Sequence, residues 1–295
     1  MRVLVAGANG QLGQDLQKAL AAHGHEVTAL GRAELDVTDR DAAIAAVAGH
    51  DAVVNASAYT KVDDAETHED EAYAINALGT ENLAVAAAAA GARYVTVSTD
   101  YVFDGHAGEP YAEDTPRDPI NAYGRTKAAG EELALAAHPD GTYIVRTAWL
   151  YGAGGANFAR TMVKLAGSHE TVSVVADQLG QPTWTGDLAD QIVALLESDA
   201  PSGVYHGTNS GQASWFEFAK AVFSAAGLNP DRVTPTDSAT FVRPAPRPSY
   251  SVLAHGAWAK AGLTPMRSWE AALADAARQG VLDLETNDDT QRGGR

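Results

Sequence analysis

Residues 1–13 read Met-Arg-Val-Leu-Val-Ala-Gly-Ala-Asn-Gly-Gln-Leu-Gly, an apolar run followed by three glycines at GxxGxxG spacing. The run Val3–Ala6 predicts a buried strand, and the residues from Gln11 onward predict a helix. A glycine turn lets a pyrophosphate approach the backbone, and the N–H groups of a helix N-terminus can bind it. The usual fingerprint is GxGxxG, so a plain strand–helix turn is the alternative. Its place at the first strand–helix junction favours a dinucleotide-binding loop. The loop residues are Gly7, Gly10, Gln11, Leu12 and Gly13.

Short apolar runs alternate with alanine-rich stretches along the first half of the chain. The runs are nearly continuous, which is typical of strands in a parallel sheet covered on both faces. The predicted strands are Val3–Ala6, Val27–Leu30, Ala52–Asn55, Tyr94–Ser98, Tyr143–Arg146 and Val172–Val175. The predicted helices are Gln11–Ala22, Asp41–Val47, Ala72–Ala90 and Ala122–Ala136. This alternation predicts a doubly wound, Rossmann-like α/β fold with a parallel sheet.

The regular pattern ends near Leu150, where glycine-rich and proline-rich segments begin. Such loops usually line binding sites. We expect a nucleotide-binding domain over residues 1–150, completed by part of residues 170–206. A smaller, interleaved C-terminal substrate domain is expected over residues 151–284. Residues 285–295 are polar and are expected to form a disordered tail.

Composition and charge narrow the classes of function. The 295-residue chain carries 21 Lys and Arg against 38 Asp and Glu, a formal net charge of −17, and no cysteine. The acidic balance argues against a nucleic-acid partner. The absence of cysteine excludes disulfides, thiolate catalysis and zinc–cysteine sites. The nine histidines lack a ligand spacing such as His-x-x-x-His, so no catalytic metal is predicted. No segment reads as a signal peptide or membrane span, so we expect a cytoplasmic enzyme without a membrane partner.

Arg32 follows the second predicted strand. An NAD site commonly has an acid there for the ribose hydroxyls, whereas an arginine accommodates a 2′-phosphate. Arg32 therefore favours NADPH as the cofactor, with NADH as the alternative. A solvated surface arginine would need no functional explanation, so this residue alone does not decide the cofactor.

Tyr123-Gly124-Arg125-Thr126-Lys127 lies in a predicted helix, which puts the Tyr123 phenol and the Lys127 ammonium on one face. The lysine charge is expected to lower the pKa of the phenol, so that the pair can protonate a carbonyl as it becomes an alkoxide. Both residue types are also common on solvated helix faces. Thr99 adds context, because it ends a predicted strand, where ligands bind in an open α/β sheet.

Six segments, taken in order, carry a resemblance to a known family. They are Asn55–Asp63, Ser98–Gly105, Tyr123–Lys127, Arg146–Gly152, Asn157–Phe158 and Asp177–Thr183. From about Met1 to about Ala277 the chain resembles the extended short-chain dehydrogenase/reductase superfamily, and within it the reductases of dTDP-linked 4-keto sugars. The resemblance implies an oxidoreductase of dTDP-rhamnose biosynthesis. It would transfer hydride from NADPH to the C4 ketone of dTDP-4-dehydro-β-L-rhamnose.

The resemblance also implies roles for individual residues. Gly10, Gln11 and Leu12 would contact the cofactor pyrophosphate. Asp36 and Val37 would flank the adenine, and Ala58, Tyr59 and Thr60 would line the path to the nicotinamide. Thr99, Tyr123 and Lys127 would be catalytic, with Tyr123 as the general acid; Tyr123 and Lys127 would also contact the cofactor. The expected substrate-binding residues are Thr99, Asp100, Trp149, Asn157 and Arg243. Arg243 is included because a guanidinium fork matches a diphosphate, and it is favoured over Arg247.

Departures from the family pattern leave alternatives open. Related 4,6-dehydratases carry Asp-Glu after the strand-end threonine, but here Asp100 is followed by Tyr101, so dehydration is not expected. The alternatives are a reductase of another nucleotide-linked 4-keto sugar, a non-catalytic NADP-binding regulatory subunit, and an interaction module without nucleotide binding. Some relatives form magnesium-linked dimers through acidic side chains. Asp15 matches the first such position, but the second falls on Gly186, next to Asp187. The sequence therefore leaves open a monomer or a homodimer, and whether Mg²⁺ is bound.

Overall fold

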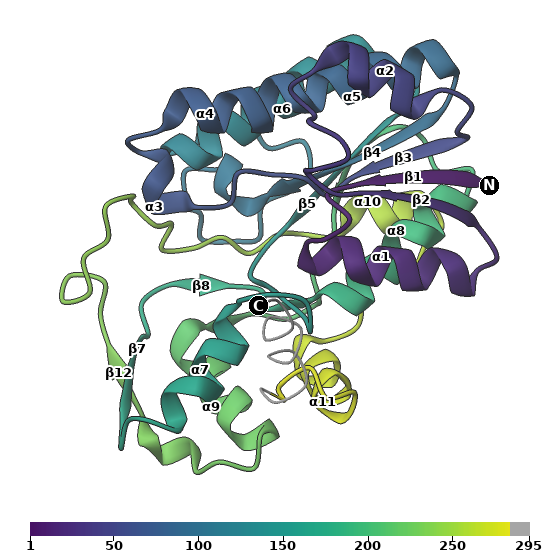
Figure 1. The fold of residues 1–295 in the computed structure, drawn as a ribbon. Coiled ribbons are helices and arrows are strands. Elements are labelled where there is room, and N and C mark those ends of the chain that lie inside the picture. Colours follow the sequence, from purple (N-terminus) through teal and green to yellow (C-terminus); the bar gives the residue numbers. More distant parts are fainter. Residues whose placement is uncertain (284–295) are drawn as a thin grey trace, which may run out of the picture.

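The computed structural model describes residues 1–283, and its centre is a six-stranded sheet in which every neighbouring pair is parallel (Figure 1). The strands are β1 (Arg2–Ala6), β2 (Glu26–Leu30), β3 (Ala52–Asn55), β4 (Arg93–Thr99), β5 (Thr142–Thr147) and β10 (Gly203–His206). Their order is β10-β5-β4-β3-β1-β2. The chain goes from β1 outward to β2 and returns to β3 on the other side of β1. The order therefore reverses between β1 and β3, where open α/β sheets bind ligands.

Helices cover both faces of this sheet, as the continuous apolar strands predict. On β1, Val3 and Val5 pack in the core formed with α1 (Gln11–Ala22) and α8 (Thr185–Glu197). Leu4 and Ala6 pack in the core formed with α2 (Arg40–Val47) and α5 (Gly79–Ala90). The helices of the two layers are α1 (Gln11–Ala22), α2 (Arg40–Val47), α5 (Gly79–Ala90), α6 (Ala122–Ala137), α8 (Thr185–Glu197) and α10 (Gly256–Lys260) (Figure 1). The predicted doubly wound α/β fold is confirmed.

Two predicted elements differ from the observed ones. Val172–Val175 is a strand, β7, but it pairs with β12 (Val233–Thr236) outside the central sheet, and β10 takes the sixth place. The helix expected over Ala72–Ala90 begins earlier, as α4 (Glu69–Tyr73), and passes through a π-helical turn at Ala74–Leu78 into α5. Two shorter elements follow strand ends: α3 (Val62–Ala65) after β3, and a 3₁₀ turn (Asp100–Val102) after β4.

The second half of the chain forms a smaller part with its own apolar core, which includes Tyr151, Phe218 and Trp269. Its two-stranded sheets are β6 (Leu150–Tyr151) with β9 (Thr183–Trp184), β7 with β12, and β8 (Leu179–Gly180) with β11 (Ala213–Ser214). Its helices are α7 (Phe158–Ala166), α9 (Trp215–Ala225), a 3₁₀ turn (Pro230–Arg232) and α11 (Trp269–Arg278).

The two parts are interleaved along the chain (Figure 1). The chain leaves the smaller part to form α8 and β10 of the larger part, re-enters the smaller part, and then returns to the larger part to form α10. The residue boundaries expected for the two domains stay predictions. The expected disordered tail, residues 285–295, lies outside the described residues. Within residues 1–283, no helix combines the length and the hydropathy needed to cross a membrane.

Candidate active site

The glycine loop lies between β1 and α1, at the point where the strand order reverses. Gly7 has a φ of +78°, and a Cβ built on it would lie 2.6 Å from the backbone nitrogen of Ser57. A Cβ on Gly13 would lie 2.3 Å from the Gly7 carbonyl oxygen, so the first turn of α1 packs directly on the loop. No acidic residue lies in that first turn, so its N–H groups are free to hold an anion. The loop therefore fits a pyrophosphate.

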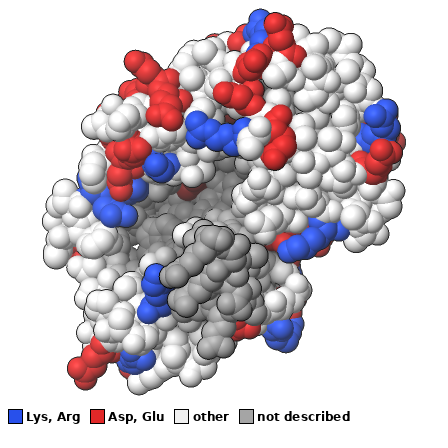
Figure 2. Space-filling view, in the orientation of Figure 1, with Lys and Arg blue, Asp and Glu red and all other residues white. Residues whose placement is uncertain are grey.

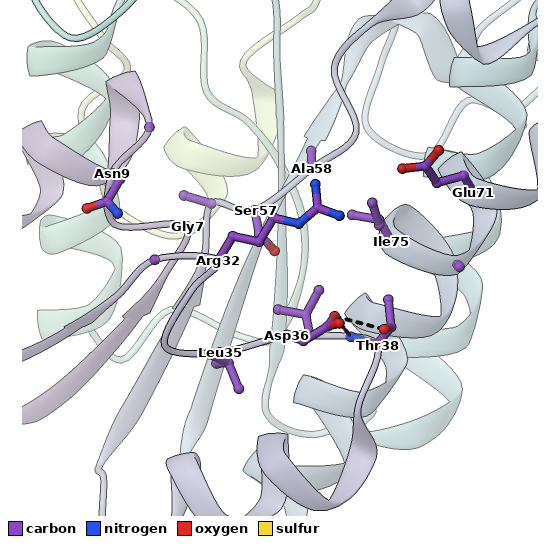
Figure 3. A pocket seen from close by; sticks show the side chains of 15 residues that line it. Gly7, Asn9, Arg32, Leu35, Asp36, Thr38, Ser57, Ala58, Glu71 and Ile75 are labelled. Carbon is purple, nitrogen blue, oxygen red and sulfur yellow. Dashed lines mark hydrogen bonds between the residues drawn. The ribbon is translucent and has the colours of Figure 1, made fainter. Parts of the chain in front are cut away.

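A pocket of about 430 Å³ opens beside the loop (Figure 3). The predicted cofactor residues that line it are Gly7, Gly10, Arg32, Asp36, Val37 and Ala58. Asp36 accepts hydrogen bonds from Thr38 N and Oγ1 at 3.0 and 2.8 Å, which hold the pKa of Asp36 below its ordinary value. The Arg32 side chain reaches across the pocket toward Ala58 and Ile75 (Figure 3). Its guanidinium offers the cation that a 2′-phosphate needs.

Replacing Arg32 with alanine is expected to raise KM for NADPH by roughly 10–100-fold, because one charge-assisted contact of about 1.5–3 kcal/mol is lost. KM for NADH should stay within about twofold, since NADH lacks the 2′-phosphate. Steady-state kinetics with both cofactors measures this. Arg278→Ala, an exposed arginine at the end of α11, is the control and should change neither value. An unchanged KM for NADPH in Arg32→Ala would contradict the prediction that Arg32 binds the 2′-phosphate.

A second pocket, of about 630 Å³, continues from the first, because Asn9, Gly10 and residues 56–58 line both. The space-filling view shows the molecule hollowed between its larger and smaller parts (Figure 2). The second pocket brings together residues of all three predicted roles. These are Thr99, Tyr123 and Lys127, the cofactor residues Gly10, Gln11, Leu12, Ala58 and Thr60, and the substrate residues Asp100, Trp149 and Asn157. Pockets of these volumes are typical of small-molecule sites.

Local packing positions Tyr123 at the start of α6. Asn121 caps the helix, and its Oδ1 accepts a hydrogen bond from Gly124 N at 2.8 Å. A Cβ on Gly124 would lie 2.1 Å from the Tyr101 carbonyl oxygen, so a glycine is needed for α6 to approach the end of β4 this closely. Tyr123 consequently shares a side-chain hydrogen bond with Thr99 and packs edge-on against Tyr101, with ring centroids 6.0 Å apart.

Lys127 lies one turn further along α6 and is buried. Its Nζ donates a hydrogen bond to the Val97 carbonyl oxygen at 2.7 Å. Burial lowers the pKa of Lys127 to about 8, and the charge of Glu131 acts in the opposite direction. Burial, followed by the charge of Asp100, raises the pKa of Tyr123. This direction is opposite to the one expected from Lys127, because desolvation of the phenol dominates and the ammonium is bound to the strand backbone.

Asp100 is the buried carboxylate of the site. Thr99 Oγ1 donates a hydrogen bond to Asp100 Oδ1 at 2.9 Å. Burial raises the pKa of Asp100 to about 6, against the opposing effects of side-chain hydrogen bonding with Ser251 and then with Thr99. Asp100 Oδ2 is buried and has no hydrogen-bond partner among residues 1–283. A buried oxygen of this kind can accept a hydrogen bond from a bound hydroxyl.

Asp100→Asn is expected to make the free energy of unfolding less sensitive to pH. The folded pKa of Asp100 lies above its ordinary value of 3.8, so the wild type loses stability as the pH rises toward about 6. The asparagine variant lacks this loss. The difference in free energy of unfolding, variant minus wild type, should therefore increase by roughly 2–3 kcal/mol between about pH 4 and pH 7. Urea unfolding at both pH values measures it. An equal difference at the two pH values would contradict the raised pKa.

Two stacked indoles form the wall of the second pocket on the side of the smaller part. The Trp149 and Trp215 ring centroids lie 3.5 Å apart, with the planes 9° apart. Trp149 has a φ of +46°, the only positive φ of a non-glycine residue among residues 1–283. Strained backbone of this kind concentrates at functional sites. Trp215 is not among the predicted site residues, since a tryptophan at the start of a helix carries no sequence signal for a binding site.

Asn157 connects the cofactor loop to the smaller part. Its Nδ2 donates hydrogen bonds to Gln11 Oε1 at 2.9 Å and to the Gly152 carbonyl oxygen at 2.8 Å. A substitution of Gln11 or Asn157 would therefore remove a contact between the cofactor loop and the smaller part. Sequence reasoning did not identify this contact, because the two residues are far apart along the chain.

Three predicted site residues, Gly13, Tyr59 and Arg243, do not line either pocket. The Tyr59 hydroxyl bonds to Asp64, which raises the pKa of Tyr59 to about 12. Arg243 is half exposed, and its Nε lies 3.6 Å from Asp63 Oδ2. Arg247 is more buried and lies closer, with Nη2 at 3.0 Å from Asp63 Oδ1. One carboxylate thus binds both arginines of the proline-rich loop, and neither arginine lines the two pockets.

The acidic residues considered for a magnesium-linked dimer have partners within the chain. Asp15 Oδ2 accepts a hydrogen bond from Thr185 Oγ1 at 2.6 Å, and Asp187 pairs with Arg267 at 2.8 Å. Among residues 1–283, no group of three or more His, Asp or Glu is arranged to hold a metal ion. The oligomeric state and the role of Mg²⁺ stay predictions.

Comparisons with known proteins identify relatives. The family model described as the RmlD substrate binding domain matches residues 1–281. The chain is 50% identical over 281 residues to a dTDP-4-dehydrorhamnose reductase of Streptomyces griseus, covering 93% of this chain and 92% of that protein. It is 49% identical over 284 residues to a probable dTDP-4,6-dihydroxy-2-methyloxan-3-one 4-ketoreductase of Streptomyces antibioticus, with 94% of each covered. A crystal structure of dTDP-4-dehydrorhamnose reductase from Bacillus anthracis, in complex with NADP, aligns with a TM-score of 0.90 at 41% identity, covering 94% of this chain and 99% of that one.

Proposed function

The chain belongs to the RmlD substrate binding domain family, together with dTDP-4-dehydrorhamnose reductases, and from this membership we propose that it is an NADPH-dependent reductase of a dTDP-linked 4-keto sugar. The proposed substrate is dTDP-4-dehydro-β-L-rhamnose, whose C4 ketone becomes the alcohol of dTDP-β-L-rhamnose. One observation supports this most strongly: Thr99, Tyr123 and Lys127 line a pocket that is continuous with the pocket of the glycine loop. The NADP complex of the Bacillus anthracis relative supports the choice of cofactor.

The chain's own residues provide binding, orientation and a proton. NADPH, when bound, supplies the hydride. The Gly7–Gly13 loop and the N-terminus of α1 hold the pyrophosphate, and Arg32 holds the 2′-phosphate. Holding cofactor and ketone together in one groove contributes much of the rate.

Tyr123 is the general acid in this mechanism. Its raised pKa keeps the phenol protonated until the ketone accepts the hydride. An alkoxide is a much stronger base than a phenolate, so proton transfer from Tyr123 Oη to the new alkoxide is favourable. The Thr99 hydroxyl, which donates to Asp100 Oδ1 in this structure, turns to donate a hydrogen bond to the ketone oxygen when the sugar binds. The Lys127 ammonium stabilises the phenolate that remains.

A second candidate is a reductase of a different dTDP-linked 4-keto sugar. It is favoured by one observation: the Streptomyces antibioticus relative, named for another ketone, is 49% identical, almost as similar as the reductase of Streptomyces griseus. Both candidates use the same cofactor pocket and the same catalytic residues. They differ in the sugar contacts, among which Asp100, Trp149 and Trp215 line the pocket.

The test is NADPH fluorescence decay with a panel of dTDP-4-keto sugars at equal concentration. The proposal predicts the highest kcat/KM for dTDP-4-dehydro-β-L-rhamnose. A higher value for another ketone in the panel would select the second candidate. Binding of NADPH without turnover of any panel member would instead support a non-catalytic regulatory subunit and contradict both candidates.

A further inference from the structure

Glu131 is a buried carboxylate behind the pocket that the proposed reaction does not use. It lies on α6 one turn after Lys127 and is 2% exposed. Its Oε1 accepts hydrogen bonds from Ser98 Oγ at 2.6 Å and from Arg146 Nε at 2.9 Å. Its Oε2 accepts one from Arg146 Nη2 at 2.7 Å and a longer one, of 3.4 Å, from Arg117 Nη1.

These contacts join the elements that carry the catalytic residues. Ser98 lies on β4 directly before Thr99, Arg146 lies on β5, and Glu131 lies on α6. Lys127 Nζ bonds to the carbonyl oxygen of Val97, the residue before Ser98. The helix is thus fixed to the end of β4 at two successive residues, through Lys127 at Val97 and through Glu131 at Ser98.

We propose that Glu131 is a positioning residue of the reductase: its carboxylate fixes α6 against β4 and β5 and keeps the buried Lys127 in its charged form. The inference rests on the proposed function. Glu131 does not line the pocket, so it acts through Lys127 and the strand end that carries Thr99.

The charge of Glu131 matters because a buried ammonium is unstable without a compensating charge. Among the other titratable or charged groups near this part of α6, Asp100, Tyr101 and Tyr123 line the same pocket as Lys127. Arg117 and Arg146 bind the Glu131 carboxylate, and His206 bonds to Arg146. On the outer face of α6, Glu69 pairs with Arg125. Glu131 is the charge that raises the pKa of Lys127 against the effect of burial. Loss of this carboxylate should therefore leave Lys127 partly neutral at neutral pH.

The first test measures Lys127 directly. The full chain is labelled with carbon-13 at lysine Cε and titrated by NMR, with the Lys127 signal assigned by its loss in a Lys127→Arg variant. In Glu131→Gln the pKa of Lys127 is expected to fall by about one unit or more. Glu132→Gln is the matched control, because Glu132 is the next residue along α6 and its side chain is 76% exposed. It should leave the Lys127 titration unchanged.

The second test is the pH profile of kcat/KM. The ratio of wild-type to Glu131→Gln activity should rise roughly tenfold between pH 6 and pH 9, since a lower Lys127 pKa removes the cation first at high pH. A purely structural defect would lower activity by the same factor at every pH. The double variant Glu131→Gln/Arg146→Met removes both members of the ion pair, a change that buried pairs often tolerate. If the single variant does not fold, this double variant should still show a lowered Lys127 pKa, by less than in the single variant because loss of the Arg146 cation acts in the opposite direction.

An unchanged Lys127 pKa together with a pH-independent activity ratio would overturn the inference. The test of Glu131 and the test of the proposed function can fail independently of each other. Failure of the wild type to reduce any dTDP-4-keto sugar would refute the reductase, whereas the NMR titration would still decide whether Glu131 controls the charge of Lys127.

Discussion

Tyr123→Phe is expected to lower kcat by about 10²–10⁴-fold, the usual contribution of a positioned general acid. The substitution removes one oxygen and keeps the ring, so the edge-on contact with Tyr101 is retained. NADPH affinity should change little, because Tyr123 is only one of the proposed cofactor contacts and those of the glycine loop and Arg32 are retained. The measurement is steady-state turnover on dTDP-4-dehydro-β-L-rhamnose, combined with NADPH binding by fluorescence titration.

Tyr101→Phe provides the matched control for this prediction. Tyr101, like Tyr123, is a partly buried phenol that lines the second pocket, but it lies on the 3₁₀ turn after β4 and not on α6. Its loss of a hydroxyl should cost much less in kcat than the loss at Tyr123. Near-normal turnover by Tyr123→Phe, or equal losses in the two variants, would contradict the role of Tyr123 as the acid.

Gly7→Ala is expected to cost about 3 kcal/mol or more in the free energy of unfolding and to weaken NADPH binding by about tenfold or more. Two effects add. A non-glycine residue at a φ of +78° is strained by about 1–2 kcal/mol. The new Cβ would also lie 2.6 Å from Ser57 N, so the loop that bears Ser57 must move away from the cofactor pocket. Chemical denaturation and NADPH titration measure the two quantities.

Gly24→Ala separates the two effects. Gly24 has a similar φ of +76°, but a Cβ there would meet no atom within 4 Å. The control therefore carries the conformational strain without the steric contact and should keep wild-type NADPH affinity. If both variants lost the same stability and both bound NADPH normally, close packing of Gly7 on Ser57 would have no role in the cofactor site.

The fold could be predicted largely from hydrophobic patterning. Strands such as Ala52–Asn55 are buried on both faces and read as unbroken apolar runs, which identifies a parallel sheet. The predictions that failed concern single strands. Val172–Val175 also reads as an apolar strand, but sheet membership depends on long-range pairing, which a short run does not encode. The sixth strand, Gly203–His206, carries too little apolar sequence to be distinguished from a loop.

The site could be predicted where its residues sit at strand ends and helix starts. Thr99, Tyr123 and the glycine loop follow this rule, because an open α/β sheet brings the carboxyl ends of its strands together. Residues that depend on tertiary contacts were not predicted. Trp215 reaches the pocket by stacking on Trp149 from the smaller part. The pKa of Tyr123 depends on burial, which neighbours along the helix do not reveal.

The most direct test of the reductase is the fate of the hydride in a single turnover. NADPH with both hydrogens at the nicotinamide C4 replaced by deuterium is mixed with excess wild-type enzyme and dTDP-4-dehydro-β-L-rhamnose, and the product sugar is analysed by NMR and mass spectrometry. We predict one deuterium at C4 of the sugar, at a rate that Tyr123→Phe lowers by about 10²-fold or more. Recovery of the ketone unlabelled and unreduced, with the deuterium still on the cofactor, would contradict the account.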